Sequence, residues 1–386
     1  MDQLPEEITS SIFTIACTDD GRTAKSLLLV SKKTKRIVAP IQWHSVSLSG
    51  QTEFCGFAAK VSKLSEYRPI YHLFISDRAA SEAYHPWSRT NATTIEELHS
   101  REETERVRWR HAQNIILEHA APTVQTLTFL ALDPRNSARR VGDMFKRVYP
   151  NLRELTLRVP PLQPLFASEP IDLTAGPFVS VDSDKSHLLP RLQRLHVAGH
   201  FKKTTSASSR IKAISSGVTH LRLSGIFAYP FARELGAELF LRGVLQHDVL
   251  AENPTNPLPS PFLPLSMQCI VIQPTNPTYA DDWGTDHGEE TIALLKTLED
   301  AAEDPTQLLY ISPLPKSFYT YDQAKEDWLS RVNGGFGCWK ISETEGSPEV
   351  EHESPEAEQD SEGGPLPSRL GGKSYLGSLI NSLFGW

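Results

Sequence analysis

The chain has 386 residues, of which 39% are hydrophobic and 22% are charged, so it can bury a core and is neither wholly disordered nor fibrous. No apolar run approaches the roughly 18 residues that cross a bilayer, and the acidic start is unlike a secretory signal, so we expect no membrane association and a cytoplasmic or nuclear location. Residues 341–368 hold nine acidic and no basic side chains, and the near-neutral remainder argues against a nucleic-acid partner.

Four cysteines are spread along the chain without a CxxC pair, and they are Cys17, Cys55, Cys269 and Cys338. Their spacing argues against a zinc module and against a disulfide framework. We therefore expect these side chains to be reduced and mostly buried.

The first region, residues 3–48, has the spacing of three short helices. Apolar residues recur at steps of three and four from Ile8 to Ile15, and again from Ala24 to Val30 and from Ile37 to Ile41. A turn at residues 19–21 follows the first helix, and we expect Pro40 to end the second long helix because proline cannot donate a backbone hydrogen bond. The basic run Lys32 to Arg36 fits a nuclear-import cluster, but we interpret it as the solvated face of a helix.

Three segments of this region resemble an F-box of the kind abundant in fungal proteins. They are Leu4-Pro5-x-Glu7-Ile8-x3-Ile12-Phe13, Leu27-Leu28-Leu29-Val30-Ser31-Lys32 and Pro40-Ile41-Gln42-Trp43. In that family three helices bind the adaptor Skp1, which links the protein to a cullin-RING ubiquitin ligase, while C-terminal repeats select the substrate. The resemblance implies a set of Skp1-binding side chains, namely Leu4, Pro5, Ile8, Ile12, Leu29, Val30 and Trp43.

The small size of this module supports the same expectation independently. A module of about 45 residues cannot bury all its apolar side chains, so some of them should form an exposed strip that needs a partner. The alternative is a helical cap on the following domain that binds no adaptor.

A pattern of apolar-x-x-apolar-x-apolar recurs six times in the second region. The copies are Ile70, Leu73, Ile75; Val124, Leu127, Phe129; Leu152, Leu155, Leu157; Leu192, Leu195, Val197; Val218, Leu221, Leu223; and Met267, Ile270, Ile272. Two of the five steps between copies match a leucine-rich period of roughly 20–29 residues, and the others suggest insertions or skipped units. We interpret residues 49–340 as an irregular leucine-rich-repeat-like solenoid of alternating strands and helices. The alternative is an ordinary α/β domain with a parallel sheet.

Helical spacing appears between the copies and after them. We expect helices that begin at Thr93 or Thr94 and run to about Ala120, that span Glu234 to Leu250, and that span Tyr321 to Val332. The last of these should cap the open edge of the solenoid. Residues 341–372 have the composition of a disordered acidic linker, whereas residues 373–386 form a short amphipathic segment that can dock on a partner or on the chain itself.

Catalytic and metal-binding signatures are weak in this sequence. It has no GxSxG, HExxH or GxGxxG motif, and Gly372-Lys373-Ser374 lacks the first glycine of a phosphate-binding loop. The pair His196 and His200 has metal-site spacing but no further ligands, so we expect an ordinary surface histidine. The acidic stretch Asp281 to Glu290 can bind a cation or supply an acid and a base, although the start of a helix explains it better.

These observations lead to one functional expectation and two alternatives. The expected function is substrate recognition in a Skp1-cullin-F-box ubiquitin ligase, with no catalysis, cofactor or metal and with a protein target held on the concave face of the repeats. An adaptor-independent interaction protein would instead hide Leu4, Ile8, Leu29 and Val30 against the repeats. A hydrolase on an ordinary α/β domain would use a pocket near the Asp281 to Glu290 loop.

Overall fold

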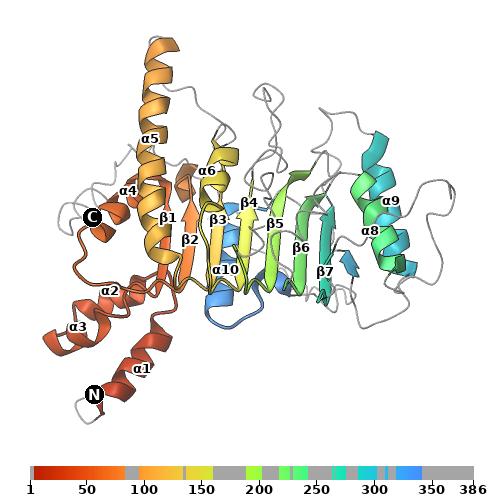
Figure 1. Cartoon of the computed structure of the whole chain (residues 1–386). Helices are drawn as coiled ribbons and strands as arrows, with labels where there is room; N and C mark the ends of the chain where they lie inside the picture. Colours follow the sequence, from red (N-terminus) through yellow and green to blue (C-terminus); the bar gives the residue numbers. More distant parts are fainter. Residues whose placement is uncertain are drawn as a thin grey trace, which may run out of the picture. The chain divides into compact units, whose positions relative to one another are not determined.

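In the part of the chain that the structure describes, eight parallel strands follow one another across a single sheet in the order of the chain (Figure 1). The computed structural model describes residues 4–82, 95–133, 136–159, 188–201, 217–226, 229–241, 263–264, 266–274, 286–301, 309–311 and 319–340. The strands are β1 (Ser45–Ser49), β2 (His72–Ser76), β3 (Thr126–Leu130), β4 (Glu154–Arg158), β5 (Arg194–Phe201), β6 (His220–Ile226), β7 (Cys269–Pro274) and β8 (Leu309–Ile311). The expected α/β class is therefore confirmed, and the sheet is parallel.

The described helices fall into three groups. The N-terminal group is α1 (Glu6–Ala16), α2 (Arg22–Leu28) and α3 (Lys32–Val38). The helices between strands are α4 (Gly50–Val61), α5 (Ile95–Ala120), α6 (Ser137–Met144), α8 (Tyr229–Leu241) and α9 (Asp286–Ala301), with the short turn η1 (Ala80–Glu82). The last group is α10 (Tyr321–Val332) followed by η5 (Gly337–Trp339).

All six copies of the sequence pattern form strands, and their apolar positions align across the sheet. The middle position of each copy pairs with the middle position of the next, in the order Leu73, Leu127, Leu155, Leu195, Leu221 and Ile270. The first position of every copy is buried, and these residues are Ile70, Val124, Leu152, Leu192, Val218 and Met267. The unequal insertions between copies therefore leave the register of these apolar rows unchanged.

The backbone hydrogen bonds between neighbouring repeats recur as regularly as the apolar side chains. The carbonyl two residues before the middle apolar position accepts two hydrogen bonds from the next repeat, as His44 does from the N–H groups of Tyr71 and His72 at 2.9 and 2.8 Å. The same arrangement recurs at the carbonyls of Tyr71, Gln125, Arg153, Gln193 and Thr219. This ladder satisfies the backbone at the amino ends of the strands, where a turn would otherwise leave polar groups unpaired.

The first and last strands of the sheet, β1 and β8, are not among the six copies of the sequence pattern. In β1, Trp43 occupies the first apolar position ahead of Val46 and Leu48, so the copy was hidden inside the segment assigned to the N-terminal module. Before β8 the corresponding position is Thr306 in the sequence, which breaks the apolar pattern. The boundary at residue 48 expected from the sequence thus falls inside a strand of the sheet.

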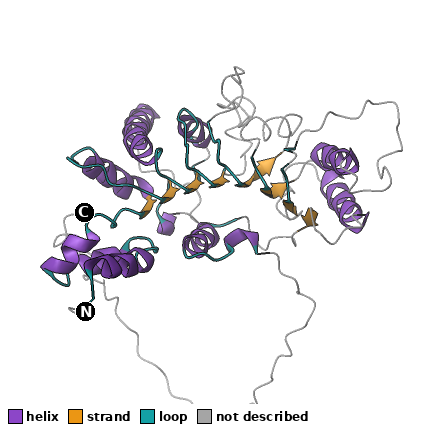
Figure 2. Ribbon diagram, turned by 60° about the horizontal axis from the view of Figure 1, so that its bottom comes forward, coloured by secondary structure: helices purple, strands orange, loops and turns teal. Residues whose placement is uncertain are grey.

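One face of the sheet packs against the helices that connect the strands. Figure 2 shows α4, α5 and α6 along this face. Its core joins the apolar rows of the strands with side chains of α4, α5, α6, α8 and α9. Within it, the rings of Phe54 and Trp109 stack at 4.0 Å with an angle of 8° between their planes.

The opposite face is covered by α10 and η5, which corrects the expected position of this segment (Figure 2). The helix has the predicted bounds, and Thr320 and Gln323 form a capping box at its start. Instead of closing the last edge of the sheet, it lies on β2 and β3, where Trp328 packs 5.6 Å from the ring of Phe74. Polar residues that alternate with the apolar row of β4 contact this segment, since Glu154 binds Arg331 and Arg158 donates to the carbonyl of Tyr319.

Several expected elements are only partly described. The helix predicted to end at about Ala120 is α5, whose predicted caps Thr93 and Thr94 lie outside the described residues. The helix predicted from Glu234 begins earlier, at Tyr229, and residues 242–250 lie outside the described part. Residues 341–372 and 373–386, expected as a linker and an amphipathic segment, also lie outside it.

Candidate functional site

The N-terminal helices enclose a small core of their own. Asp19 accepts hydrogen bonds from the backbone N–H groups of Gly21 and Thr23 at 2.9 and 2.8 Å, which starts α2 after a tight turn. Ser31 caps α3 by accepting a hydrogen bond from the N–H of Thr34. The residues that fill the core are Phe13, Cys17, Ala24, Ile37, Val38 and Ile41.

Helix α1 turns one apolar face inward and another outward. Phe13 and Cys17 are buried in the small core. Ile8, Ile12 and Ile15 recur at helical spacing on the other side, where they are 50%, 47% and 74% exposed. Because burial of such side chains stabilises a protein by about 1.5–3 kcal/mol each, an outward face of three isoleucines favours association.

Most of the predicted binding residues share this exposure. Leu4 is 44% exposed, Leu29 and Val30 at the end of α2 are 75% and 69% exposed, and Pro5 is also exposed. The strip is therefore not hidden against the repeats, as an adaptor-independent protein would require. Ile15 belongs to the same outward face, although the sequence comparison with the F-box pattern did not include it.

Trp43 is the exception among the predicted binding residues. Its ring packs 5.0 Å from Phe57 and 6.0 Å from His119, and the guanidinium of Arg68 lies 5.7 Å from its centroid. These contacts place Trp43 against the core of the sheet domain, away from the exposed residues of α1. The structure therefore does not bring it together with the other predicted residues.

Helix α10 connects the N-terminal helices to the sheet. The hydroxyl of Thr18, just after α1, donates a hydrogen bond of 2.7 Å to the side chain of Asn333 at the end of α10. Lys325 lies 3.7 Å from Asp20, and it also bonds Ser47 on β1. These contacts tie the turn between α1 and α2 to the same helix that covers the sheet.

Charged side chains of the sheet hold α10 in place. Arg331 donates to Glu154 on β4 through Nε at 2.7 Å and through Nη2, and Arg194 on β5 adds a third bond at 2.9 Å. Burial alone would raise the pKa of Glu154, but the bonds from Arg331 and Arg194 outweigh it and hold this pKa below its usual range. Farther along, Arg222 donates to the carbonyl of Cys338 at 2.5 Å.

Residues 319–339 of the chain itself therefore cover this face of the sheet. The cover extends from Ser49, whose hydroxyl lies 2.6 Å from that of Tyr321, to His220, whose ring meets Trp339 edge-on at 5.9 Å. A protein target cannot reach these strands while residues 319–339 stay in place. The expectation of a protein target on the concave face of the repeats stays a prediction.

His196 is buried, which corrects its expected place on the surface. It lies on β5 beneath the cover, with its Nε2 3.0 Å from the hydroxyl of Ser224 and its ring edge-on to Tyr319 at 4.7 Å. Burial lowers its pKa well below the usual range, so it is neutral at pH 7. The side chain of His200 lies outside the described residues, and no three metal-ligating side chains meet in the described part of the chain.

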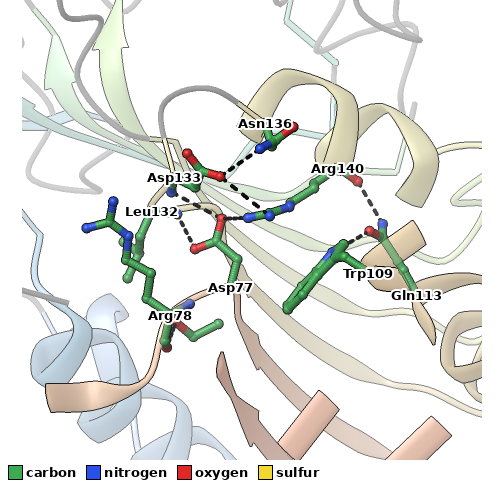
Figure 3. A network of polar contacts seen from close by, with 9 residues as sticks. Asp77, Arg78, Trp109, Gln113, Leu132, Asp133, Asn136 and Arg140 are labelled. Atoms are coloured by element: carbon green, nitrogen blue, oxygen red, sulfur yellow. Dashed lines mark hydrogen bonds and ion pairs between the residues drawn. The ribbon is translucent and has the colours of Figure 1, made fainter. Parts of the chain in front are cut away.

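A polar network at the carboxyl ends of β2 and β3 was not anticipated (Figure 3). Asp77 is fully buried and accepts hydrogen bonds from the N–H groups of Leu132 and Asp133 at 2.8 and 3.1 Å. Arg140 donates to it at 2.5 Å, lies 3.5 Å from Asp133, and stacks over Trp109 at 4.7 Å. Both carboxylate oxygens of Asp77 accept hydrogen bonds within the protein. We therefore interpret the network as a structural clamp, which joins the end of β2 to the residues that follow β3.

The signal for this clamp is present in the sequence. Asp77 directly follows β2 and Asp133 lies just beyond β3, and acidic residues after neighbouring parallel strands meet at one edge of the sheet. The partner cation comes from α6, which sequence spacing alone does not connect to them.

The remaining chemical candidates give no reactive centre in the described residues. Burial raises the pKa of Cys17 and Cys269 to about 11 and that of Cys338 to about 12, so these free cysteines are protonated at pH 7. The expected helix after the acidic stretch is confirmed, since α9 begins at Asp286. Residues 281–285 lie outside the described part.

None of the helices in the described part combines the length and apolar character that crossing a bilayer requires. The chain matches no protein-family model, no curated protein and no solved structure.

Proposed function

We propose that the chain is a substrate-recognition subunit of a Skp1-cullin-F-box ubiquitin ligase and is not itself catalytic. The observation that carries the proposal is the outward apolar face of the N-terminal helices, where Leu4, Ile8, Ile12, Leu29 and Val30 are all 44–75% exposed. The F-box resemblance implies that these residues bind a partner. None of them belongs to the buried core that the three helices form.

The sheet supports the second half of the proposal, a leucine-rich-repeat-like domain. Its strands follow the chain in order, its apolar rows stay in register, and the carbonyl of each repeat accepts the same pair of hydrogen bonds from the next. These features are typical of a stack of repeats, in which each unit contacts mainly its neighbours.

The mechanism is one of proximity, because the protein holds a target near a charged ubiquitin-transfer enzyme. A fixed geometry between the N-terminal helices and the sheet serves this purpose. The bonds of Thr18 to Asn333 and of Lys325 to Ser47 supply such a connection. Since residues 319–339 cover the polar face, we place the target contact elsewhere on the sheet domain.

Co-expression with Skp1 tests the proposal. The wild-type chain should co-purify with Skp1 at one-to-one stoichiometry, measured by size-exclusion chromatography with light scattering. Leu4→Asp, Ile8→Asp should abolish the complex, because two buried carboxylates would replace two apolar contacts. The matched control is Val107→Asp, Val148→Asp. Val107 lies on α5 and Val148 follows α6, and the two side chains are 57% and 53% exposed.

The control double variant should bind Skp1 like the wild type. A wild-type monomer that ignores Skp1 while retaining its circular dichroism spectrum would refute the proposal. Loss of binding in both double variants would show that any added charge disturbs the complex, and it would remove the assignment of the interface to α1.

A further inference from the structure

The outer surface of the sheet domain has a seam where α5 packs against α6 (Figure 2). Arg110 on α5 donates a hydrogen bond of 3.2 Å to the carboxylate of Asp143 on α6. Arg147, just after α6, donates to the side chain of Asn114 on α5 at 2.8 Å and to the backbone carbonyl of Asp143 at 3.0 Å. Contacts from both helices therefore hold the polar side chains of this seam in position.

Cations outnumber carboxylates along the seam. Lys146 also pairs with Asp143, and Arg139 is exposed one turn before that residue on α6. Residues 136–153 hold five cations and a single carboxylate, and residues 106–117 hold three arginines and no carboxylate. The seam cations are Arg110, Arg139, Lys146 and Arg147. Asp143 neutralises only one of their four charges.

An anionic partner would stabilise this arrangement. Like charges that the fold holds close together repel each other, and a bound anion removes that cost. The side chains of Arg110 and Lys146 are 48% and 66% exposed, so their remaining donors can be reached from solvent. Guanidinium groups bind carboxylates through two parallel hydrogen bonds, which makes a carboxylate a suitable ligand for the seam arginines.

Exposed valines lie beside the seam cations. Val107 lies one turn before Arg110 and is 57% exposed, and Val148 follows Arg147 and is 53% exposed. The aromatic side chains of the same two stretches, Trp109, Phe145 and Tyr149, are all buried, so they cannot stack on nucleic-acid bases. A peptide that carries both acidic and apolar side chains therefore suits this surface better than a single-stranded nucleic acid does.

We infer that the seam between α5 and α6 binds an acidic, extended segment of a protein partner. The helical rise places Val107 and Asn114 about 10 Å apart along α5, which about three or four residues of an extended peptide span. The binding itself needs no adaptor. That the partner is the target of the ligase rests on the proposed function, in which the target contacts the sheet domain away from the face that residues 319–339 cover.

Fluorescence anisotropy with a labelled peptide of alternating glutamate and leucine tests the inference. The wild-type chain should bind this peptide with an affinity that falls as salt is added, and it should not bind the same peptide with glutamine in place of glutamate. Arg139→Gln, Lys146→Gln should weaken the binding about tenfold, because two cations are lost. Arg110 still pairs with Asp143 in this variant, so its urea denaturation should differ little from that of the wild type.

The matched control is Lys35→Gln, Lys63→Gln, which removes two exposed cations on α3 and after α4. This control should bind the acidic peptide like the wild type. Equal losses in the two double variants would overturn the inference, since the binding would then follow net charge alone. Tighter binding of an oligothymidylate than of the acidic peptide would also overturn it, since the seam would then be a nucleic-acid site.

Binding to Skp1 separates this inference from the proposed function. Peptide binding that depends on Arg139 and Lys146, in a chain that ignores Skp1, would support the seam and reject the ligase proposal. A chain that binds Skp1 but not the acidic peptide would support the ligase proposal and reject the seam.

Discussion

Glu154 on β4 and Arg331 on α10 are 177 positions apart and form a two-point ion pair, with Nε and Oε2 separated by 2.7 Å. The pair is largely shielded from water and joins the covering helix to the middle of the sheet. Its strength bears on whether residues 319–339 form a permanent part of the fold.

We expect Glu154→Gln to lower the free energy of unfolding by about 1–3 kcal/mol at pH 7, because Arg331 and Arg194 lose a charged acceptor. The pKa of Glu154 is depressed in the folded state, so its contribution is present above the unfolded value of 4.5 and is lost as the pH falls through the lower folded value. The difference between wild type and variant should therefore shrink below about pH 4.5. Urea denaturation at pH 7 and pH 4 measures it, with the exposed Glu105→Gln as a control that should differ little from wild type.

Trp328 supplies the apolar part of the same cover. It is 2% exposed and packs against Phe74, while its Nε1 makes no hydrogen bond to the described residues. Trp328→Ala should destabilise the protein by about 3–5 kcal/mol. Trp328→Phe should cost much less, because it keeps a ring at this position and gives up no hydrogen bond. Equal losses in the two variants, measured by urea denaturation, would contradict this account.

Lys325 gives the covering segment, residues 319–339, a second pH dependence of the same sign, at alkaline pH. Its pKa is lowered to about 8, mainly by burial, although Asp20 opposes the shift. The unfolded chain holds this proton up to about pH 10.5, so the contribution of Lys325 to stability should rise with pH between about 8 and 10.5. The free energy of unfolding of the wild type, relative to Lys325→Met, should increase across this range. A constant difference would show that the ammonium is not penalised by its surroundings.

Arg140 neutralises the buried carboxylate of Asp77. Arg140→Met should lower the free energy of unfolding by about 3–5 kcal/mol, because it leaves a buried charge without its cation. Arg139→Met is the matched control, since Arg139 is the preceding residue of α6 and is exposed. Thermal or urea unfolding of both variants measures the effect. Similar values for the two would mean that Asp77 is neutral or is solvated in the folded protein.

The sequence predicted those parts of the fold that local pattern determines. The apolar pattern identified six strands, because burial on the helix side selects large apolar residues at the same positions in each repeat. The bounds of α10 were correct because Thr320 and Gln323 form a capping box that starts the helix. Of the predicted binding residues, Ile8 and Leu29 were expected to be exposed and are.

Position in space was harder to predict than secondary structure. Glu154, Arg194 and Arg222 alternate with apolar residues, as solvent-facing side chains do, and only their ion pairs and hydrogen bonds with distant residues place α10 over them. Trp43 fits both the F-box pattern and the first repeat of the sheet. Its ring packs against Phe57 on α4, so it belongs to the sheet domain. Such choices depend on contacts far apart in sequence.

The late position of α10 has a consequence for synthesis of the protein. About 245 residues separate Phe74 from Tyr319, so at 5–20 residues per second the ribosome needs about 10–50 s to supply the helix that covers that ring. The strands, by contrast, can add to the sheet one after another as they emerge, because each pairs with the strand made just before it. Until residues 319–339 have been made, the growing chain therefore exposes the ring of Phe74 on the uncovered face of the sheet. An exposed apolar surface of this kind is one that chaperones bind.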